Sequence, residues 1–140
     1  MSEAERFPEV EPRLRVVENA VGEGFAPVAS PERLHAVRQR HGLPARFALL
    51  LGNTDPKKNI PTAIEGFLRY AENAPDPLHL VVADLAPERL DAILRDAGAE
   101  DLRSRFVLPG YVPHEDLPAL YSMCGVFLYP SLRESFGLPI

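Results

Sequence analysis

Phe47-Ala48-Leu49-Leu50-Leu51-Gly52 is the stretch of sequence that decides the fold. An unbroken apolar run of this length is typical of a strand that is buried on both faces, and Gly52 ends it. The chain then stays polar until Asn59, and from Ile60 onwards apolar residues recur every three or four positions, which indicates an amphipathic helix. We therefore predict a buried strand over 47–51, a loop, and a helix that has Asn59 as its N-cap.

The same alternation of strand and helix recurs along the chain. Apolar runs between turn residues predict three more strands, over 78–83, 105–108 and 126–129. Amphipathic patterns with an early proline predict three more helices, over 31–41, 87–97 and 117–124. This alternation predicts an α/β domain, a Rossmann-like parallel sheet with helices on both faces. A β-prone run, Arg15-Val16-Val17-Glu18, predicts a lead-in strand.

Size and charge exclude several classes of protein. The length of 140 residues, with 46% hydrophobic and 25% charged residues, is that of a single globular domain. A net charge of −5 provides no basic field to hold nucleic acid or an anionic membrane. A single cysteine excludes a disulfide framework, and no apolar run reaches the length that spans a bilayer. We therefore expect a cytoplasmic protein without a transmembrane segment.

Unusual residues collect in the loops that follow the predicted strands. Ligands of open parallel sheets bind at the carboxyl ends of the strands, which directs attention to the loops 52–59, 84–86, 109–114 and 130–138. The first of these loops contains the only two lysines of the chain, whereas the other thirteen cationic residues are arginine. This bias singles out the loop 52–59 as a candidate binding loop.

The lysines of this loop, Lys57 and Lys58, lie just before a predicted helix. Free N–H groups and the dipole of a helix N-terminus favour an anion. The loop lacks the second glycine and the Gly-Lys-Ser/Thr ending of a Walker loop, but a mobile lysine at this place suits a diphosphate. The alternative interpretation is a pair of solvated surface lysines.

The loop 130–138 surrounds one carboxylate, Glu134, with apolar residues. Gly137 lets the backbone approach a ligand closely, and consecutive N–H groups there can donate to sugar hydroxyls or to phosphate. Glu134 can accept hydrogen bonds from a pair of sugar hydroxyls. The alternative interpretation is a surface turn with an exposed glutamate.

Other chemistry-bearing residues give weaker signals. The four histidines show no ligand spacing and the chain has no Asp-x-Asp pair, so we predict no metal site. Cys124 lies on an apolar helix face and is expected in the core. Asp84 directly follows a strand, and it would be the phospho-acceptor if the chain were a receiver-like regulatory module, one form of a non-catalytic nucleotide-binding domain.

Four motifs follow one another in a fixed order and spacing. They are Leu51-Gly52 through Pro56-Lys57-Lys58-Asn59, then Val107-Leu108-Pro109-Gly110-Tyr111-Val112, then Leu117-Pro118-Ala119-Leu120-Tyr121, and finally Val126-Phe127-Leu128-Tyr129-Pro130-Ser131 with Glu134-Ser135-Phe136-Gly137-Leu138-Pro139. Together they resemble the nucleotide-sugar-binding C-terminal half of group 1 retaining glycosyltransferases, which have the two-domain GT-B fold. The resemblance is strongest over 47–140, and residues 1–46 would be the lead-in strand and helix of a single partial domain.

This resemblance implies roles for individual residues. Lys58 matches the lysine that neutralises the donor diphosphate as it leaves, and Glu134 matches the first acid of the Glu-x7-Glu motif near the transferred sugar. The family often has an arginine where this chain has Asn53, so Lys57 is expected to substitute for that cation. The other donor-binding positions that it implies are Gly52, Asn53, Tyr111, Val112, Ser135, Phe136, Gly137 and Leu138.

The resemblance also implies what the polypeptide does alone. The second glutamate of the motif would fall past Ile140, and the N-terminal acceptor domain is absent, so we expect an incomplete domain that does not turn over by itself. Its ligand would be a GDP- or UDP-linked sugar, with no metal or other cofactor. The complete enzyme is expected in the cytoplasm, as a peripheral protein at the inner membrane face.

Two expectations concern the domain itself. An apolar patch near Phe127, Tyr129 and Leu138 should be exposed at the edge of the sheet and support a homodimer. As a further alternative, the domain binds no ligand and is only a stable core.

Overall fold

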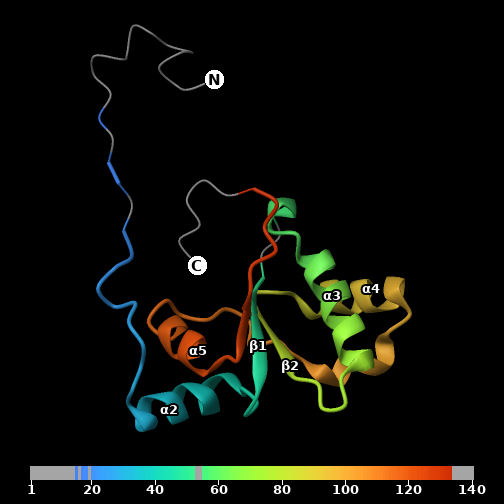
Figure 1. Ribbon diagram of the computed structural model, residues 1–140, viewed down its shortest axis with the longest axis horizontal. Coiled ribbons are helices and arrows are strands. Elements are labelled where there is room, and N and C mark those ends of the chain that lie inside the picture. Colours follow the sequence, from blue (N-terminus) through green and yellow to red (C-terminus); the bar gives the residue numbers. More distant parts are fainter. Residues whose placement is uncertain (1–14, 16, 19, 53–54, 134–140) are drawn as a thin grey trace, which may run out of the picture.

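Four parallel strands form the centre of the part of the chain that the structure describes (Figure 1). The computed structural model describes residues 15, 17–18, 20–52 and 55–133. The strands are β1 Phe47–Leu51, β2 His79–Ala83, β3 Phe106–Val107 and β4 Val126–Leu128, in the order β3-β2-β1-β4. In the register, Leu49 of β1 lies between Val81 of β2 and Phe127 of β4. The predicted parallel α/β sheet is confirmed.

Helices connect the strands. They are α2 Pro31–His41, α3 Ile60–Asn73, α4 Pro87–Ala97 and α5 Leu117–Met123, with the short 3-10 helices η2 Pro56–Lys58 and η3 Glu100–Arg105. The Ser30 hydroxyl accepts a hydrogen bond from the Arg33 N–H and caps α2, and Gly42 and Gly98 end α2 and α4 in the left-handed conformation. These ends follow the ordinary rules for helix caps, which is why the sequence predicted them.

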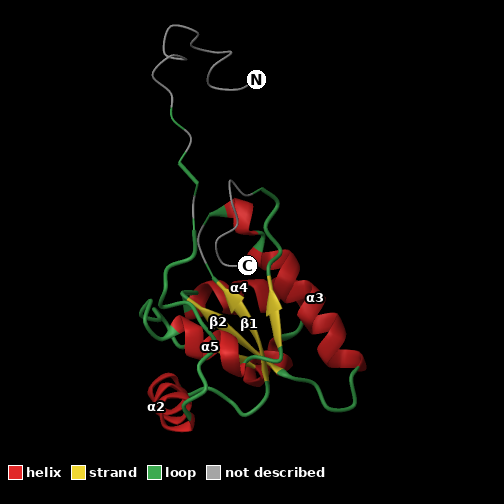
Figure 2. Ribbon diagram, turned by 60° about the vertical axis from the view of Figure 1, so that its left-hand side comes forward, coloured by secondary structure: helices red, strands yellow, loops and turns green. Residues whose placement is uncertain are grey.

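The helices cover both faces of the sheet (Figure 2). Ala48 and Leu50 of β1 belong to the core under α3 and α4, whereas Phe47 and Leu49 belong to the core under α2 and α5. Successive side chains of a strand point to opposite faces, so an entirely apolar strand is needed where both faces are covered. Within the described residues, no helix is long and apolar enough to cross a membrane.

The predicted lead-in strand is wrong for the part of it that the structure describes. Arg15, Val17 and Glu18 have no strand conformation, and the Val17 side chain is 85% exposed. β-branched residues stabilise a strand only through neighbours on a sheet, and here the sheet ends at β3 and β4.

Asn59 occupies the predicted N-cap position of α3 but does not cap the helix. Its backbone is left-handed, with φ 54°, and its side chain makes no hydrogen bond to the helix. Instead, its Nδ2 donates to the Pro130 carbonyl at 3.3 Å. The side chain therefore connects two loops, because the left-handed backbone turns it away from the N–H groups of α3.

The expected apolar patch at the edge of the sheet has a different composition. Phe127 is half-buried and packs edge-on against Tyr121 under α5, with ring centroids 5.1 Å apart, and Tyr129 is also half-buried. Among the described residues, the large apolar side chains exposed near this edge are Val126 of β4 and Leu132 of the loop that follows it. Leu138 lies outside the described residues.

Candidate functional site

A cavity of about 210 Å³ opens at the carboxyl ends of β1 and β4. The strand order reverses between these two strands, since β1, β2 and β3 follow one another to one side and β4 lies on the other side of β1. Loops diverge at such a switch point and leave a crevice in which ligands bind. The cavity is lined by Leu51, Gly52, Lys58, Leu128, Tyr129, Pro130 and Ser131.

Gly52 is required where β1 ends. Its N–H donates to the Ala83 carbonyl at 2.6 Å, and a Cβ at this position would lie 2.4 Å from that oxygen and 2.9 Å from the Asp84 carbonyl oxygen. The backbone of the neighbouring strand therefore leaves no room for a side chain. This close approach brings the loop after β1 to the cavity.

The two lysines have different positions. The Asp55 carboxylate accepts from the Lys57 N–H at 2.9 Å and starts the 3-10 turn η2, which directs Lys58 to the cavity and leaves Lys57 exposed. Lys58 is half-buried, and its Nζ lies 5.6 Å from the centroid of the Tyr129 ring. Lys58 therefore lies at the predicted anion site, whereas the Lys57 carbonyl accepts from the Leu132 N–H at 2.8 Å.

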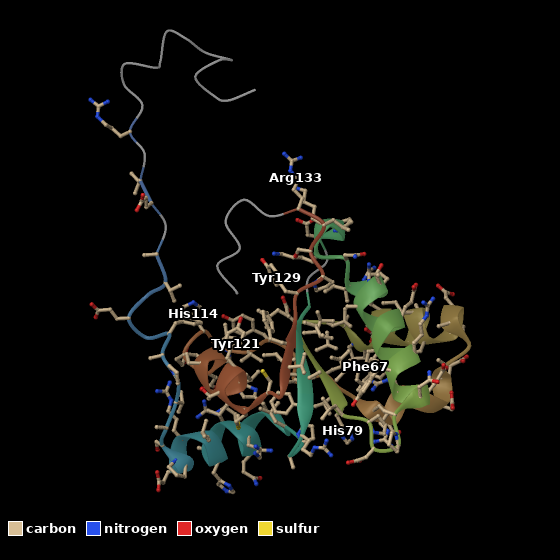
Figure 3. All side chains as sticks on the ribbon, in the orientation of Figure 1. Phe67, His79, His114, Tyr121, Tyr129 and Arg133 are labelled. Atoms are coloured by element: carbon tan, nitrogen blue, oxygen red, sulfur yellow. The ribbon has the colours of Figure 1, made fainter. Side chains whose placement is uncertain are left out.

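Ser131 and Tyr129 line the same cavity and were not predicted as site residues. The Ser131 hydroxyl is buried and has no hydrogen-bond partner among the described residues. Figure 3 shows Tyr129 at the same end of the sheet as Arg133, opposite to His79 at the start of β2. The signal that could have identified both residues is their place directly after β4, because each strand of a parallel sheet ends at the ligand-binding edge.

Tyr111 and Val112 do not line this cavity. Tyr111 is 75% exposed, whereas Val112 is 6% exposed and belongs to the core under α2 and α5. Their loop is held to the sheet by the Asp84 N–H, which donates to the Gly110 carbonyl at 2.8 Å. The structure therefore places these two residues on a neighbouring loop of the same edge, apart from Gly52 and Lys58.

A second cavity, of about 310 Å³, lies beside this loop. It shares Leu51 with the first cavity and contains the ring of Phe25, which packs edge-on against His114 with centroids 4.7 Å apart. Burial, with smaller effects from Cys124 and Tyr129, raises the pKa of Tyr121, another lining residue. The Tyr121 phenol is therefore neutral, and this cavity is apolar and aromatic, in contrast to the one beside Lys58.

A buried carboxylate anchors the loop 109–116. Asp116 Oδ2 accepts from His41 Nε2 and from the Arg40 guanidinium, both at 2.8 Å. Burial raises the pKa of Asp116, but the hydrogen bonds from His41 and Arg40 and their positive charge outweigh this effect and lower it. Asp116 is therefore ionised at neutral pH and joins the C-terminus of α2 to the N-terminus of α5.

Cys124 packs against the core, as expected. Burial raises the pKa of its thiol, which donates to the Tyr121 carbonyl at 3.4 Å. A protonated, hydrogen-bonded thiol is a poor nucleophile, so Cys124 contributes packing.

Comparison with known proteins decides the family. The family described as "Glycosyl transferases group 1" matches residues 35–140, which is most of the chain and includes the strands β1 to β4 and the helices α3 to α5. The chain belongs to the group 1 glycosyltransferases.

Several curated proteins are similar to this group 1 chain. It is 37% identical over 130 residues to the serotype-specific mannosyltransferase WbdA of Escherichia coli, which covers 91% of this chain and 16% of that protein. It is 32% identical over 114 residues to O-antigen chain mannosyltransferase B of Escherichia coli, covering 79% and 29% of the two chains. It is 31% identical over 120 residues to mannosylfructose-phosphate synthase of Agrobacterium fabrum (strain C58 / ATCC 33970), and the aligned part is 81% of this chain and 26% of that protein. The group 1 chain thus spans less than a third of each of these relatives.

The remaining predicted site residues of the group 1 domain are not described. Asn53, Glu134, Ser135, Phe136, Gly137 and Leu138 lie outside the described residues. Among residues 15, 17–18, 20–52 and 55–133, no three His, Cys, Asp or Glu side chains are grouped so that they could hold a metal ion. Asp84 therefore belongs to no such group within the described residues.

Proposed function

We propose that this chain is the donor-binding half of a retaining glycosyltransferase with the two-domain GT-B architecture. It would bind the diphosphate of a nucleotide sugar without a metal ion, while a separate domain supplies the acceptor. The reaction would form a bond between an acceptor oxygen and the anomeric carbon and break the bond to the diphosphate on the same face of the sugar.

The position of Lys58 carries this proposal. The half-buried ammonium lies beside a cavity at the switch point of a parallel sheet. A diphosphate gains negative charge as it leaves the sugar, and a fixed cation in a partly dry site stabilises that charge more than a hydrated cation does. Electrostatic stabilisation of the leaving group is thus the chemistry that this geometry supports.

Three neighbours of Lys58 would complete the diphosphate site. Gly52 forms part of the cavity wall at the end of β1, and the Ser131 hydroxyl can donate to a phosphate oxygen. Lys57 does not line the cavity and would add a second positive charge at longer range. By resemblance, Asn53 and the segment Ser135 to Leu138 would add polar and backbone contacts, and Glu134 would accept from hydroxyls of the transferred sugar. The loop with Tyr111 and Val112 would contact the nucleobase through its backbone.

The names of the relatives indicate which donor to test first. Two are mannosyltransferases and one is a mannosylfructose-phosphate synthase, so we propose a hexosyl donor, with mannose as the first candidate. GDP and UDP are both candidate nucleotides. Because the relatives are several times longer, we expect these 140 residues to bind the donor without transferring its sugar.

Ligand-dependent thermal stability tests the proposal. In a panel of GDP, UDP and ADP, the nucleotide that binds should add about 2.7 kcal/mol to the unfolding free energy at about 100 times its dissociation constant, which is a rise of several degrees in Tm. Lys58→Ala should abolish the rise, whereas Lys57→Ala should reduce it by less, because the exposed Lys57 does not line the cavity.

Two outcomes would contradict the proposal. The first is a rise in Tm that is equal in wild type and Lys58→Ala, because the ligand would then bind elsewhere. The second is the absence of any rise with all three nucleotides and with their mannose or glucose conjugates.

Self-association through the edge strand is a further part of the proposal. A groove of about 540 Å³ lies between α3 and β4 and is lined mostly by apolar residues, including Phe67, Tyr70 and the exposed Val126. We expect two copies of the chain to associate through this groove. Separately, we expect the complete enzyme to work in the cytoplasm, at the inner face of the membrane. Sedimentation at high concentration should show a dimer, and Val126→Lys should shift it to a monomer.

A further inference from the structure

Lys58 lies against an aromatic ring from a distant part of the sequence. Its Nζ is 5.6 Å from the centroid of the Tyr129 ring, within the range of a cation–π interaction. Lys58 follows β1 and Tyr129 follows β4, and both line the same cavity. The ring is therefore part of the site that we propose for the diphosphate.

The Tyr129 ring is itself held by a row of aromatic side chains. It packs against Phe127 with centroids 5.9 Å apart, and Phe127 packs against Tyr121 at 5.1 Å. Tyr121 belongs to α5, and the centroid of its ring lies 6.5 Å from that of Phe25. Tilted and edge-on contacts restrict the rotation of each ring, so this packing fixes the orientation of the Tyr129 face that lies near Lys58.

Two hydrogen bonds join the loop after β1 to the loop after β4, and they are made by the residues directly before and after Lys58. The Leu132 N–H donates to the Lys57 carbonyl at 2.8 Å, and Asn59 Nδ2 donates to the Pro130 carbonyl at 3.3 Å. The backbone of Asn59 is left-handed at this position. This conformation is unfavourable for residues other than glycine, and it is often found at functional sites. The backbone of Lys58 is thus fixed relative to the end of β4.

We propose that Tyr129 is a positioning residue for Lys58. A lysine has four rotatable bonds, and ordering its side chain on binding costs entropy that weakens the complex. The Tyr129 ring attracts the ammonium by its quadrupole and holds it at the mouth of the cavity before the anion arrives. This inference rests on the proposed function, because it assigns a role to Tyr129 in the same diphosphate site.

The two conservative variants of Tyr129 separate positioning from packing. Tyr129→Phe keeps the ring face, so it should bind GDP or UDP within about 2-fold of wild type. Tyr129→Leu keeps an apolar side chain but removes the ring, so it should weaken binding about 5-fold, the equivalent of a cation–π contact at a partly exposed site. Tyr129→Leu also removes packing against Phe127, so the Tm of the ligand-free protein is measured beside the affinity, and binding is compared at a temperature at which every variant is folded.

The position of the ammonium can be measured without any ligand. The chain has two lysines, so selective ¹³C labelling of lysine gives two ε-methylene signals, which Lys57→Arg assigns. The ring current of Tyr129 should shift the Lys58 signal upfield from the Lys57 signal. Tyr129→Phe should keep this shift and Tyr129→Leu should remove it; coincident lysine signals in wild type, or a shift that survives in Tyr129→Leu, would overturn the inference.

The same spectra separate this inference from the proposed function. Titration with inorganic pyrophosphate and with GDP should move the Lys58 signal more than the Lys57 signal. If neither ligand moves either signal while the ring-current shift is present and depends on Tyr129, the proposed function fails and the contact between Tyr129 and Lys58 stands. If the ligands bind with equal affinity to wild type and Tyr129→Leu, the proposed function stands and the positioning role fails.

Discussion

The loops at the amino ends of the strands differ in backbone conformation from the loops at the carboxyl ends; we call these two sides the strand-start edge and the strand-end edge. At the edge where the strands begin, Gly42 and Gly98 end helices in the left-handed conformation, with open space where a Cβ would lie. At the edge where the strands end, the left-handed positions include Asn59 and Asp84, with φ 54° and 57°, and Gly52 lies against backbone with no space for a side chain. The first edge follows the ordinary rules for turns, and the second departs from them at these three positions, although Gly110 there is an ordinary left-handed glycine.

This difference coincides with the position of the candidate site. Left-handed non-glycine residues and close backbone contacts cost stability, and they persist where the surrounding structure needs a specific geometry. The cavity beside Lys58 opens at the edge that carries these features. These features agree with the ligand-binding role that we propose for the strand-end edge.

The largest expected effect is that of Gly52→Ala. The added Cβ would lie 2.4 Å from the Ala83 carbonyl oxygen, so the end of β1 must move, and we expect a loss of about 3 kcal/mol in the free energy of unfolding. Gly66→Ala is the matched control, because it lies within α3 with nothing within 4 Å of the added Cβ, and it should stabilise by up to about 1 kcal/mol. Urea unfolding of both variants measures this; equal stability of the two would show that the strand-end edge is not crowded.

The next effect concerns the anchor of the loop 109–116. Asp116→Asn should cost about 2 kcal/mol at pH 7, because it replaces a buried carboxylate that accepts from His41 and Arg40. The pKa of Asp116 is lowered by folding, so this stability is present above the usual aspartate pKa and is lost as the pH falls through the lower folded value.

The difference between wild type and Asp116→Asn should therefore shrink between about pH 5 and pH 2. Urea unfolding at several pH values measures it. Asp76→Asn, which breaks only the exposed pair with Arg46, is the control and should cost less than about 1 kcal/mol. A difference that stays constant down to pH 2 would show that the Asp116 charge does not stabilise the fold.

The smallest effect compares left-handed residues of the two edges. Asp84→Gly should be neutral or stabilise by about 0.5 kcal/mol, and Asp84→Ala should cost about 1 kcal/mol, because only glycine adopts this conformation freely. Gly98→Ala, at the other edge, should also cost about 1 kcal/mol. Thermal unfolding measures all three; a strong stabilisation by Asp84→Gly would show that the strand-end edge holds more strain than the backbone angles indicate.

The sequence predicted the elements that obey local rules. Ser30, Pro31 and Gly42 mark both ends of α2 by cap chemistry, and the unbroken apolar run of β1 indicated a strand covered on both faces. Gly52 and Lys58 were also placed correctly at the strand-end edge, because a strand, a loop and a helix follow one another there. Their roles toward a ligand remain predictions.

The rest depends on which segments meet in space. Asn59 fits an N-cap by residue type, but the proximity of Pro130 gave its side chain another partner. Ser131 and Tyr129 join the site only because β4 lies beside β1, and residue patterns do not fix the order of strands. The contact of Asp116 with His41 is likewise set by the packing of α5 on α2.

The strand order also has a consequence for how the protein folds. β1, β2 and β3 are successive neighbours, so they can assemble as the chain is made, whereas β4 must return past them to pair with β1. Contacts between distant parts of a chain form late, because closing a long loop costs entropy before it is repaid. The lysine and the tyrosine of the site therefore meet only when the last strand docks, and hydrogen exchange should show β4 opening before β1 and β2. Partly folded chains would have most of a core but no place to hold a diphosphate, so binding would report complete folding.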